Sequence, residues 1–78
     1  MKYGLTEIAG RSIKVLPSKA DLFNWLSETL AGRGCEIKRN ETIRELRDEP
    51  WFPDSYLILE GADAIERHSK DTGKRIRE

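Results

Sequence analysis

The 78-residue sequence has few of the residues on which catalytic and metal sites most often depend. It contains one cysteine, Cys35, and one histidine, His68. A single cysteine excludes an internal disulfide, and one Cys with one His is too few for a zinc site of three or four ligands. The sequence also lacks a G-x-S-x-G nucleophile motif and a G-x-x-x-x-G-K-[ST] phosphate loop. We therefore expect no enzyme activity, no catalytic residues, no cofactor and no metal.

Long apolar runs are absent as well. No stretch approaches the roughly 20 apolar residues of a membrane span, and the first ten residues lack the apolar core of a secretory signal. We therefore expect a cytoplasmic protein without membrane contact. Two Trp, two Phe and two Tyr among 37% hydrophobic residues exclude a disordered composition. The length indicates a single domain over residues 1–78 with a thin core, as a monomer or a homodimer.

Net charge is the third absence, because 14 basic residues balance 14 acidic ones. The charges are nevertheless segregated: residues 1–40 and 67–78 are mildly basic, whereas residues 41–66 carry eight acidic residues against two basic ones. A neutral chain is a poor general binder of nucleic acid, since phosphate neutralisation supplies most of that affinity. A localised basic patch stays compatible with this balance. Residues 70–78 also fit a flexible basic tail.

The first half of the sequence predicts a β-hairpin followed by a helix. With Gly10 and Arg11 at the tip of a type II′ turn, Ile8 would lie beside Ile13 and Glu7 opposite Lys14. Ser18 is a favourable N-cap for the helix that follows, and Gly32 and Gly34 supply its stop. The apolar stripe of this helix, at the 3.6-residue period, consists of Leu22, Phe23, Trp25, Leu26, Thr29 and Leu30.

The second half predicts a short helix, a strand and a terminal element. Asn40 would cap a helix over residues 41–49, which Pro50 ends. Residues 56–59 form an apolar run that favours a buried strand. Residues from 62 to about 70 favour a helix, although a hairpin with "KDTG" as its turn is the alternative. The residues expected in the core are Leu5, Ile8, Ile13, Val15, Leu22, Leu26, Leu30, Ile43, Leu46, Leu57 and Leu59.

These elements together predict an α+β fold. The N-terminal β-hairpin would pack on an amphipathic helix, followed by a short second helix, one further strand and a C-terminal helix. This order buries one face of each element against another, as small domains require.

The segment "PWFPDSY" suggests a protein-binding surface. Trp51 and Phe52 lie between two prolines, and adjacent residues of an extended link point opposite ways. One of the two should therefore plug the core while the other stays partly exposed. Aromatic residues on a braced loop are typical interface anchors, so we expect Trp51, Phe52, Asp54 and Tyr56 to contact a larger protein partner. By analogy, the chain suits a small inhibitor or regulatory accessory protein of the phage or mobile-element kind.

Residues 12–49 suggest a second class of partner. A short strand ends in Leu16-Pro17, and two helical segments follow, the second opening with "KRNETIREL". This arrangement resembles the ribbon-helix-helix family of repressors and antitoxins. The resemblance implies a DNA-binding transcriptional regulator, an obligate dimer whose paired strands enter the major groove. It also implies that Ser12 and Lys14 face the bases and that Lys38, Arg39 and Asn40 hold phosphates.

The C-terminal segment "IERHSKDTGKRIR" offers another route to DNA. Read as the basic hairpin of a winged helix, it would place cations on phosphates while the acidic middle of the chain points away. Ordinary solubilising side chains explain the same cations equally well, so the protein-binding and DNA-binding hypotheses both stay open. The candidate phosphate contacts in this segment are Arg67, Lys70, Lys74, Arg75 and Arg77.

Overall fold

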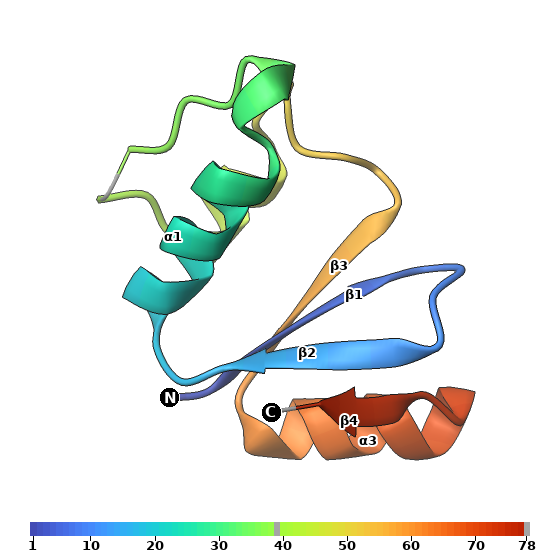
Figure 1. The fold of residues 1–78 in the computed structure, drawn as a ribbon. Helices are drawn as coiled ribbons and strands as arrows, with labels where there is room; N and C mark the ends of the chain where they lie inside the picture. Colours follow the sequence, from blue (N-terminus) through green and yellow to red (C-terminus); the bar gives the residue numbers. More distant parts are fainter. Residues whose placement is uncertain (39, 78) are drawn as a thin grey trace.

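The computed structural model describes residues 1–38 and 40–77. A four-stranded sheet in the order β3-β1-β2-β4 forms its centre, with α1 on one side and α3 on the other (Figure 1). This is an α+β fold, as the sequence predicts. Along the chain, the elements are β1 (Tyr3–Glu7), β2 (Ser12–Leu16), α1 (Lys19–Thr29), the 3₁₀ helix η1 (Ala31–Arg33), α2 (Ile43–Arg47), β3 (Tyr56–Glu60), α3 (Ala62–Thr72) and β4 (Arg75–Arg77).

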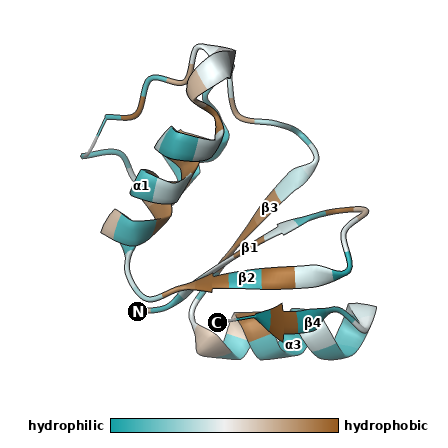
Figure 2. Cartoon of the chain, in the orientation of Figure 1, coloured by the Kyte–Doolittle hydropathy of each residue, from teal (hydrophilic) through white to brown (hydrophobic). Residues whose placement is uncertain are grey.

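The main core lies between the sheet and the helices α1 and α2. Hydrophobic residues follow β1, β2 and β3 and one side of α1 (Figure 2). Arg47 ties α2 to the sheet, because its guanidinium donates a hydrogen bond to the Ile58 carbonyl in β3. The buried members of this core are Leu5, Leu16, Leu22, Phe23, Leu26, Leu30, Ile43, Leu46, Phe52 and Ile58.

A smaller cluster lies on the opposite face of the sheet, where Ile13 and Val15 pack against Ile65 of α3. Gly4 permits this approach, since a Cβ there would lie 2.8 Å from Cγ1 of Ile65. The alternation of β3 divides its side chains between the two clusters. Ile58 enters the main core, whereas Leu57 and Leu59 are only half-buried, which corrects their predicted place in the core.

The hairpin forms, but its register differs from the predicted one by two residues. Leu5 rather than Glu7 pairs with Lys14, because residues 8–11 form a four-residue loop. In that loop the Gly10 N–H donates to the Glu7 carbonyl, at 2.9 Å, and the Ile8 N–H donates to Ser55 O, at 2.7 Å. Ile8 is 67% exposed, so its predicted place in the core is wrong.

The N-caps of α1 and α2 are formed by residues close in sequence. Ser18 caps α1 as predicted, accepting the Asp21 N–H at 3.2 Å. The predicted cap of α2 is wrong: Thr42 and not Asn40 occupies that position. Thr42 and Glu45 form a reciprocal capping box, in which each side chain accepts the other residue's backbone N–H. The segment Cys35–Lys38 is a link without regular structure.

The C-terminal helix is confirmed as α3, and a strand that the sequence analysis missed follows it. Gly73, at φ +73°, turns the chain after α3, and its N–H donates to Ser69 O at 2.8 Å. Residues 75–77 then return beside β2 in parallel. The alternative of a flexible basic tail is therefore replaced by helix and strand up to residue 77, while residue 78 lies outside the described part of the chain. Over the described residues, no helix is long and apolar enough to cross a membrane.

Candidate nucleic-acid interface

The pairing of β4 with β2 builds a cationic face on the sheet. In this parallel ladder Arg75 lies beside Ser12 and Arg77 beside Lys14. Since side chains alternate along a strand, these four share one face, while Ile13 and Ile76 share the other. Lys14, Arg75 and Arg77 are all exposed. Two groups of residues that the sequence analysis assigned to rival DNA-binding hypotheses therefore lie on one surface.

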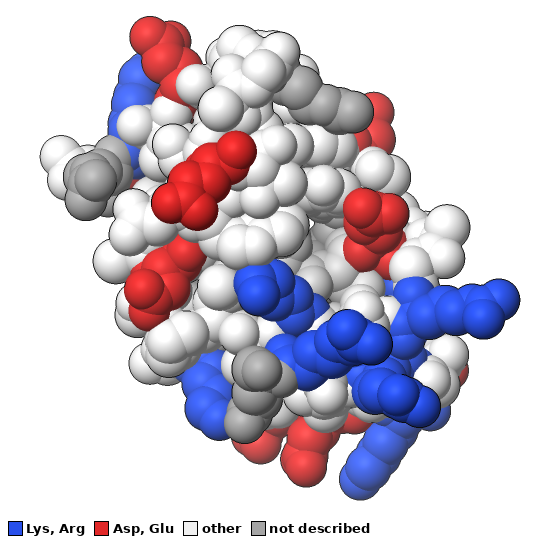
Figure 3. Space-filling view, in the orientation of Figure 1, with Lys and Arg blue, Asp and Glu red and all other residues white. Residues whose placement is uncertain are grey.

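Arg11, in the hairpin loop, extends this surface. Its carbonyl accepts the Arg75 N–H at 2.9 Å, which fixes the loop against β4. An open hollow of about 380 Å³ lies between the two, lined by Arg11, Ser12, Gly73, Arg75 and Arg77. Basic side chains gather over β2 and β4, whereas acidic ones are scattered over α1 and at the margins of the basic group (Figure 3). We define the cationic face as Arg11, Lys14, Arg75 and Arg77.

Lys74 does not join the cationic face, although it lies next to Arg75. Its side chain is buried, and its ammonium donates to Thr6 Oγ1 at 3.0 Å, to the Glu7 carbonyl at 2.6 Å and to the Ile8 carbonyl at 3.4 Å. Three donors thus meet three oxygens. The predicted phosphate contact at Lys74 is therefore wrong. Lys74 instead ties the start of β4 to the end of β1 and positions its arginines.

Four of the other predicted phosphate contacts lie outside the cationic face. Arg67 and Lys70 are exposed on α3, which packs on the opposite face of the sheet. Lys38 and Asn40 are exposed in the link before α2, and Arg39 lies outside the described residues. The structure does not gather the four described side chains, Lys38, Asn40, Arg67 and Lys70, with the cationic face.

The ribbon-helix-helix resemblance assigns β2 to the ribbon of a dimer, and the structure shows what this strand pairs with. β2, the strand that would form the dimer ribbon, lies between β1 and β4 and has both edges hydrogen-bonded. Pairing with a second copy would need one of those ladders to open. The resemblance stays a prediction.

The aromatic segment after α2 divides as predicted, with one ring inside. Phe52 is 8% exposed and belongs to the main core, whereas Trp51 is half-buried. Phe52 makes edge contacts with Trp51 and Tyr56, at ring-centroid distances of 6.1 and 6.2 Å. Asp54 is exposed and Tyr56 half-buried. These contacts place the segment in the fold, and its role as a protein-binding surface stays a prediction.

Glu41, just before α2, has a buried carboxylate close to those of Glu45 and Glu49. Glu41 is 5% exposed, and among the described residues neither of its carboxylate oxygens has a hydrogen-bond partner. Burial raises the pKa of Glu41, and the neighbouring Glu49 and Glu45 raise it further, whereas Lys38 lowers it. A proton on Glu41 would let it donate to Glu49. Burial, and then the charge of Glu41, likewise raise the pKa of the Cys35 thiol, which disfavours a reactive thiolate.

We expect Glu41→Gln to raise the melting temperature at neutral pH. Because folding raises the pKa of Glu41 above its ordinary value of 4.5, the contribution of this group to stability is greatest below that pH and is lost as the pH rises through the folded value. The gain from Glu41→Gln should therefore grow from acid to neutral pH in thermal unfolding followed by circular dichroism.

Glu45→Gln is the matched control with the opposite sign. The hydrogen bonds from Thr42, backbone first, lower the pKa of Glu45, so removing this charge should lower the melting temperature at neutral pH. A Glu41→Gln protein that is no more stable than the wild type at neutral pH would contradict the burial argument.

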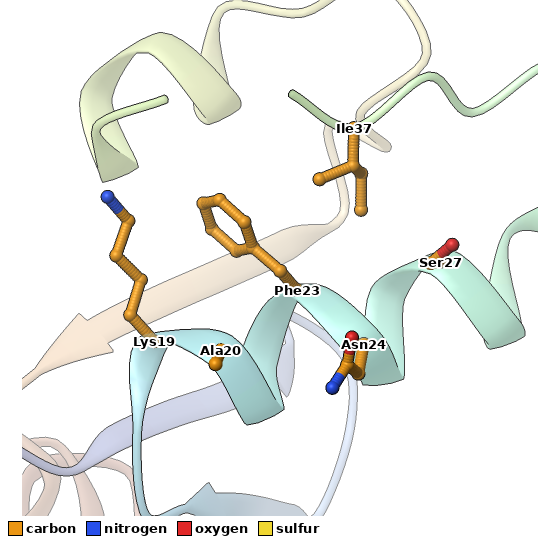
Figure 4. A pocket seen from close by; sticks show the side chains of 6 residues that line it. All are labelled: Lys19, Ala20, Phe23, Asn24, Ser27 and Ile37. Carbon is orange, nitrogen blue, oxygen red and sulfur yellow. The ribbon is translucent and has the colours of Figure 1, made fainter. Parts of the chain in front are cut away.

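A further hollow, of about 350 Å³, lies between α1 and the link after η1 (Figure 4). Phe23 and Ile37 supply its apolar wall, and the Lys19 ammonium lies 5.3 Å from the centre of the Phe23 ring. Its other lining residues are Ala20, Asn24 and Ser27. A cation, an amide and a hydroxyl offer no paired acid and base for catalysis. In the part of the chain that is described, no three metal-ligating side chains lie together.

Sequence reasoning missed Arg11 as a member of the cationic face, and it missed β4 itself. The signal for β4 was present: "RIR" alternates charged and apolar residues with the period of a strand. His68 and Cys35, the rare residues, come from α3 and from the link after η1, on opposite sides of the sheet. Comparison of the chain with protein-family models, with curated proteins and with solved structures gives no match.

Proposed function

We propose that this chain is a non-catalytic nucleic-acid-binding protein whose cationic face holds the phosphate backbone. The observation that carries the proposal is the parallel β2–β4 ladder, which brings Arg75 and Arg77 beside Ser12 and Lys14. Every second residue of these strands points to the same face, so the basic side chains on that face follow one another in a regular row. A polyanion with regularly repeated charges is the natural complement of such a row.

The chain as a whole is neutral, so the position of the charges matters more than their number. Acidic side chains over α1 lie apart from the basic group over β2 and β4 (Figure 3), so the charges of opposite sign are segregated on this side of the molecule. Arginine predominates on this face, and its planar fork suits the bidentate recognition of phosphate. Lys74 holds the arginines in place from beneath. The strand pair therefore fixes the backbone positions from which the charged side chains project.

The test is the salt dependence of binding to a fluorescent oligonucleotide, followed by fluorescence anisotropy. Neutralising about four phosphates should give a slope of log K against log salt of roughly −3. Arg75→Gln with Arg77→Gln should make this slope shallower by about 1.5, because each lost phosphate contact contributes about 0.7 to 0.9.

Arg67→Gln with Lys70→Gln provides the matched control, since it removes the same charge from α3 on the opposite side of the sheet. We expect it to leave the slope within experimental error. Absence of binding at low salt, or equal effects of the two double variants, would overturn the proposal.

A further inference from the structure

A second hollow adjoins the cationic face and has a different character. It has a volume of about 180 Å³ and is lined by residues of α1, the hairpin β1–β2 and β3. Trp25 of α1 and Tyr56 of β3 contribute aromatic rings, both half-buried, and Leu5 of β1 contributes an apolar surface. Its remaining lining residues are Thr6, Glu7, Gly10, Ser12 and Lys14.

This hollow suits a flat ring better than an ion or a large ligand. Its volume falls below the roughly 300–1,000 Å³ of pockets for drug-sized molecules. Two aromatic rings over a small apolar floor are the usual platform for stacking a base. Glu7 lies on the rim and would repel a phosphate from this position, while Lys14 lies on the side toward the arginines.

Ser12 lines both this aromatic hollow and the arginine hollow. A base seated in the first therefore has a binding place for the phosphate of the same strand directly beside it. We propose that the aromatic hollow takes one unpaired base, which makes single-stranded nucleic acid the ligand of this protein. This inference rests on the proposed function, because the cationic face supplies the phosphate contacts.

A duplex would not use the hollow. Bases in a duplex are paired and stacked on their neighbours, so their faces are unavailable to a protein ring unless the base leaves the stack. The strand pair alone could still touch the backbone of a duplex. Preference for a single strand is therefore the property that separates base stacking from charge attraction alone.

The experiment compares three probes of equal length with the wild-type protein, using fluorescence anisotropy at fixed salt. The probes are an oligothymidylate of about 12 nucleotides, the same backbone with abasic sites in place of the bases, and a duplex. The oligothymidylate should bind about tenfold more tightly than the abasic strand, which carries the same charge, and more tightly than the duplex. An oligouridylate of the same length shows whether the protein prefers RNA or DNA. Tighter binding of either single strand than of the abasic strand and the duplex supports the proposal.

Variants then assign the effect to the hollow. Tyr56→Leu should bring the affinities for the oligothymidylate and the abasic strand close to each other. Tyr56→Phe should keep the wild-type preference, because it keeps the ring. A Trp51→Phe protein retains Trp25 as its one tryptophan, so stacking should quench its fluorescence with oligothymidylate and not with the abasic strand. This readout serves even where Tyr56→Leu impairs folding, since it needs no change in the hollow.

The outcomes separate this inference from the proposed function. Equal, salt-dependent binding of all three probes with no quenching of Trp25 would overturn the base hollow and leave phosphate binding by the cationic face standing. Binding of none of the probes at low salt would overturn both proposals. A duplex bound as tightly as the oligothymidylate would overturn the single-strand preference.

Discussion

Replacing Lys74 by methionine is expected to lower the free energy of unfolding by about 3 kcal/mol. Methionine keeps the apolar stem but removes the ammonium, so Thr6 Oγ1 and the Ile8 carbonyl lose this donor, and the Glu7 carbonyl keeps only its bonds from the Gly10 N–H and the Thr6 hydroxyl. The bond to Thr6 Oγ1 is buried and those to the two carbonyls are partly buried, so acceptors that lose this donor keep part of their desolvation cost, and the loss exceeds that of an exposed hydrogen bond. A loss of this size is a large share of the roughly 5–15 kcal/mol that stabilises a domain.

Urea unfolding followed by far-ultraviolet circular dichroism measures this loss. Lys70→Met is the control, because Lys70 is exposed on the neighbouring helix and its replacement should change stability by less than about 0.5 kcal/mol. The melting temperature of Lys74→Met should fall by about 12 °C or more. If the two variants are equally stable, Lys74 does not hold β4 in place and its burial has no energetic role.

Phe52→Ala should be the more damaging change, at about 4 kcal/mol. Phe52 fills the space between α2 and β3, and its ring meets the edges or faces of Trp51 and Tyr56. Removal of the ring leaves a cavity that the short α2 cannot close without losing its contact with the sheet. The cost combines the lost transfer of the ring from water with the cavity that remains.

Trp51→Ala provides the comparison, since the two aromatic residues are neighbours in sequence but differ in burial. Trp51 is half-buried, so its loss should cost clearly less than that of Phe52 in the same urea experiment. A Trp51→Ala protein less stable than Phe52→Ala would show that the larger ring, and not Phe52, closes the core. This comparison also bears on the protein-binding hypothesis, which needs Trp51 to be dispensable for folding.

Much of the fold could be predicted because it depends on local chemistry. The stripe of α1, the Ser18 cap and the apolar run of β3 each carry a signal within one element. The failures have a common cause, which is pairing between distant segments. The register of the hairpin depends on β3, since Ile8 bonds to Ser55, and β4 forms only because β2 offers it a free edge. Neither the Ile8–Ser55 bond nor the pairing of β4 with β2 can be inferred from residues that are neighbours in the sequence.

The candidate site shows the same division. Lysine and arginine were recognisable in the sequence as phosphate ligands, but burial decides which of them are available. Lys74 and Arg75 are adjacent and carry the same charge, yet one is inside and the other on the cationic face, because alternation along a strand turns neighbours in opposite directions. Trp25 and Tyr56 lie 31 positions apart in the sequence, so no spacing pattern predicts that they line one hollow.

The bond from Lys74 to Thr6 joins residues 68 positions apart, close to the largest separation the chain allows. Contacts of such sequence separation close the longest loop, so we expect them to form after the hairpin and α1. The cationic face consequently exists only in molecules that have folded from end to end. A ligand that binds this face also stabilises that last step, by mass action. Occupancy by a polyanion should thus slow the local detachment of β4, and amide hydrogen exchange in residues 75–77 would report how much of the protein is loaded.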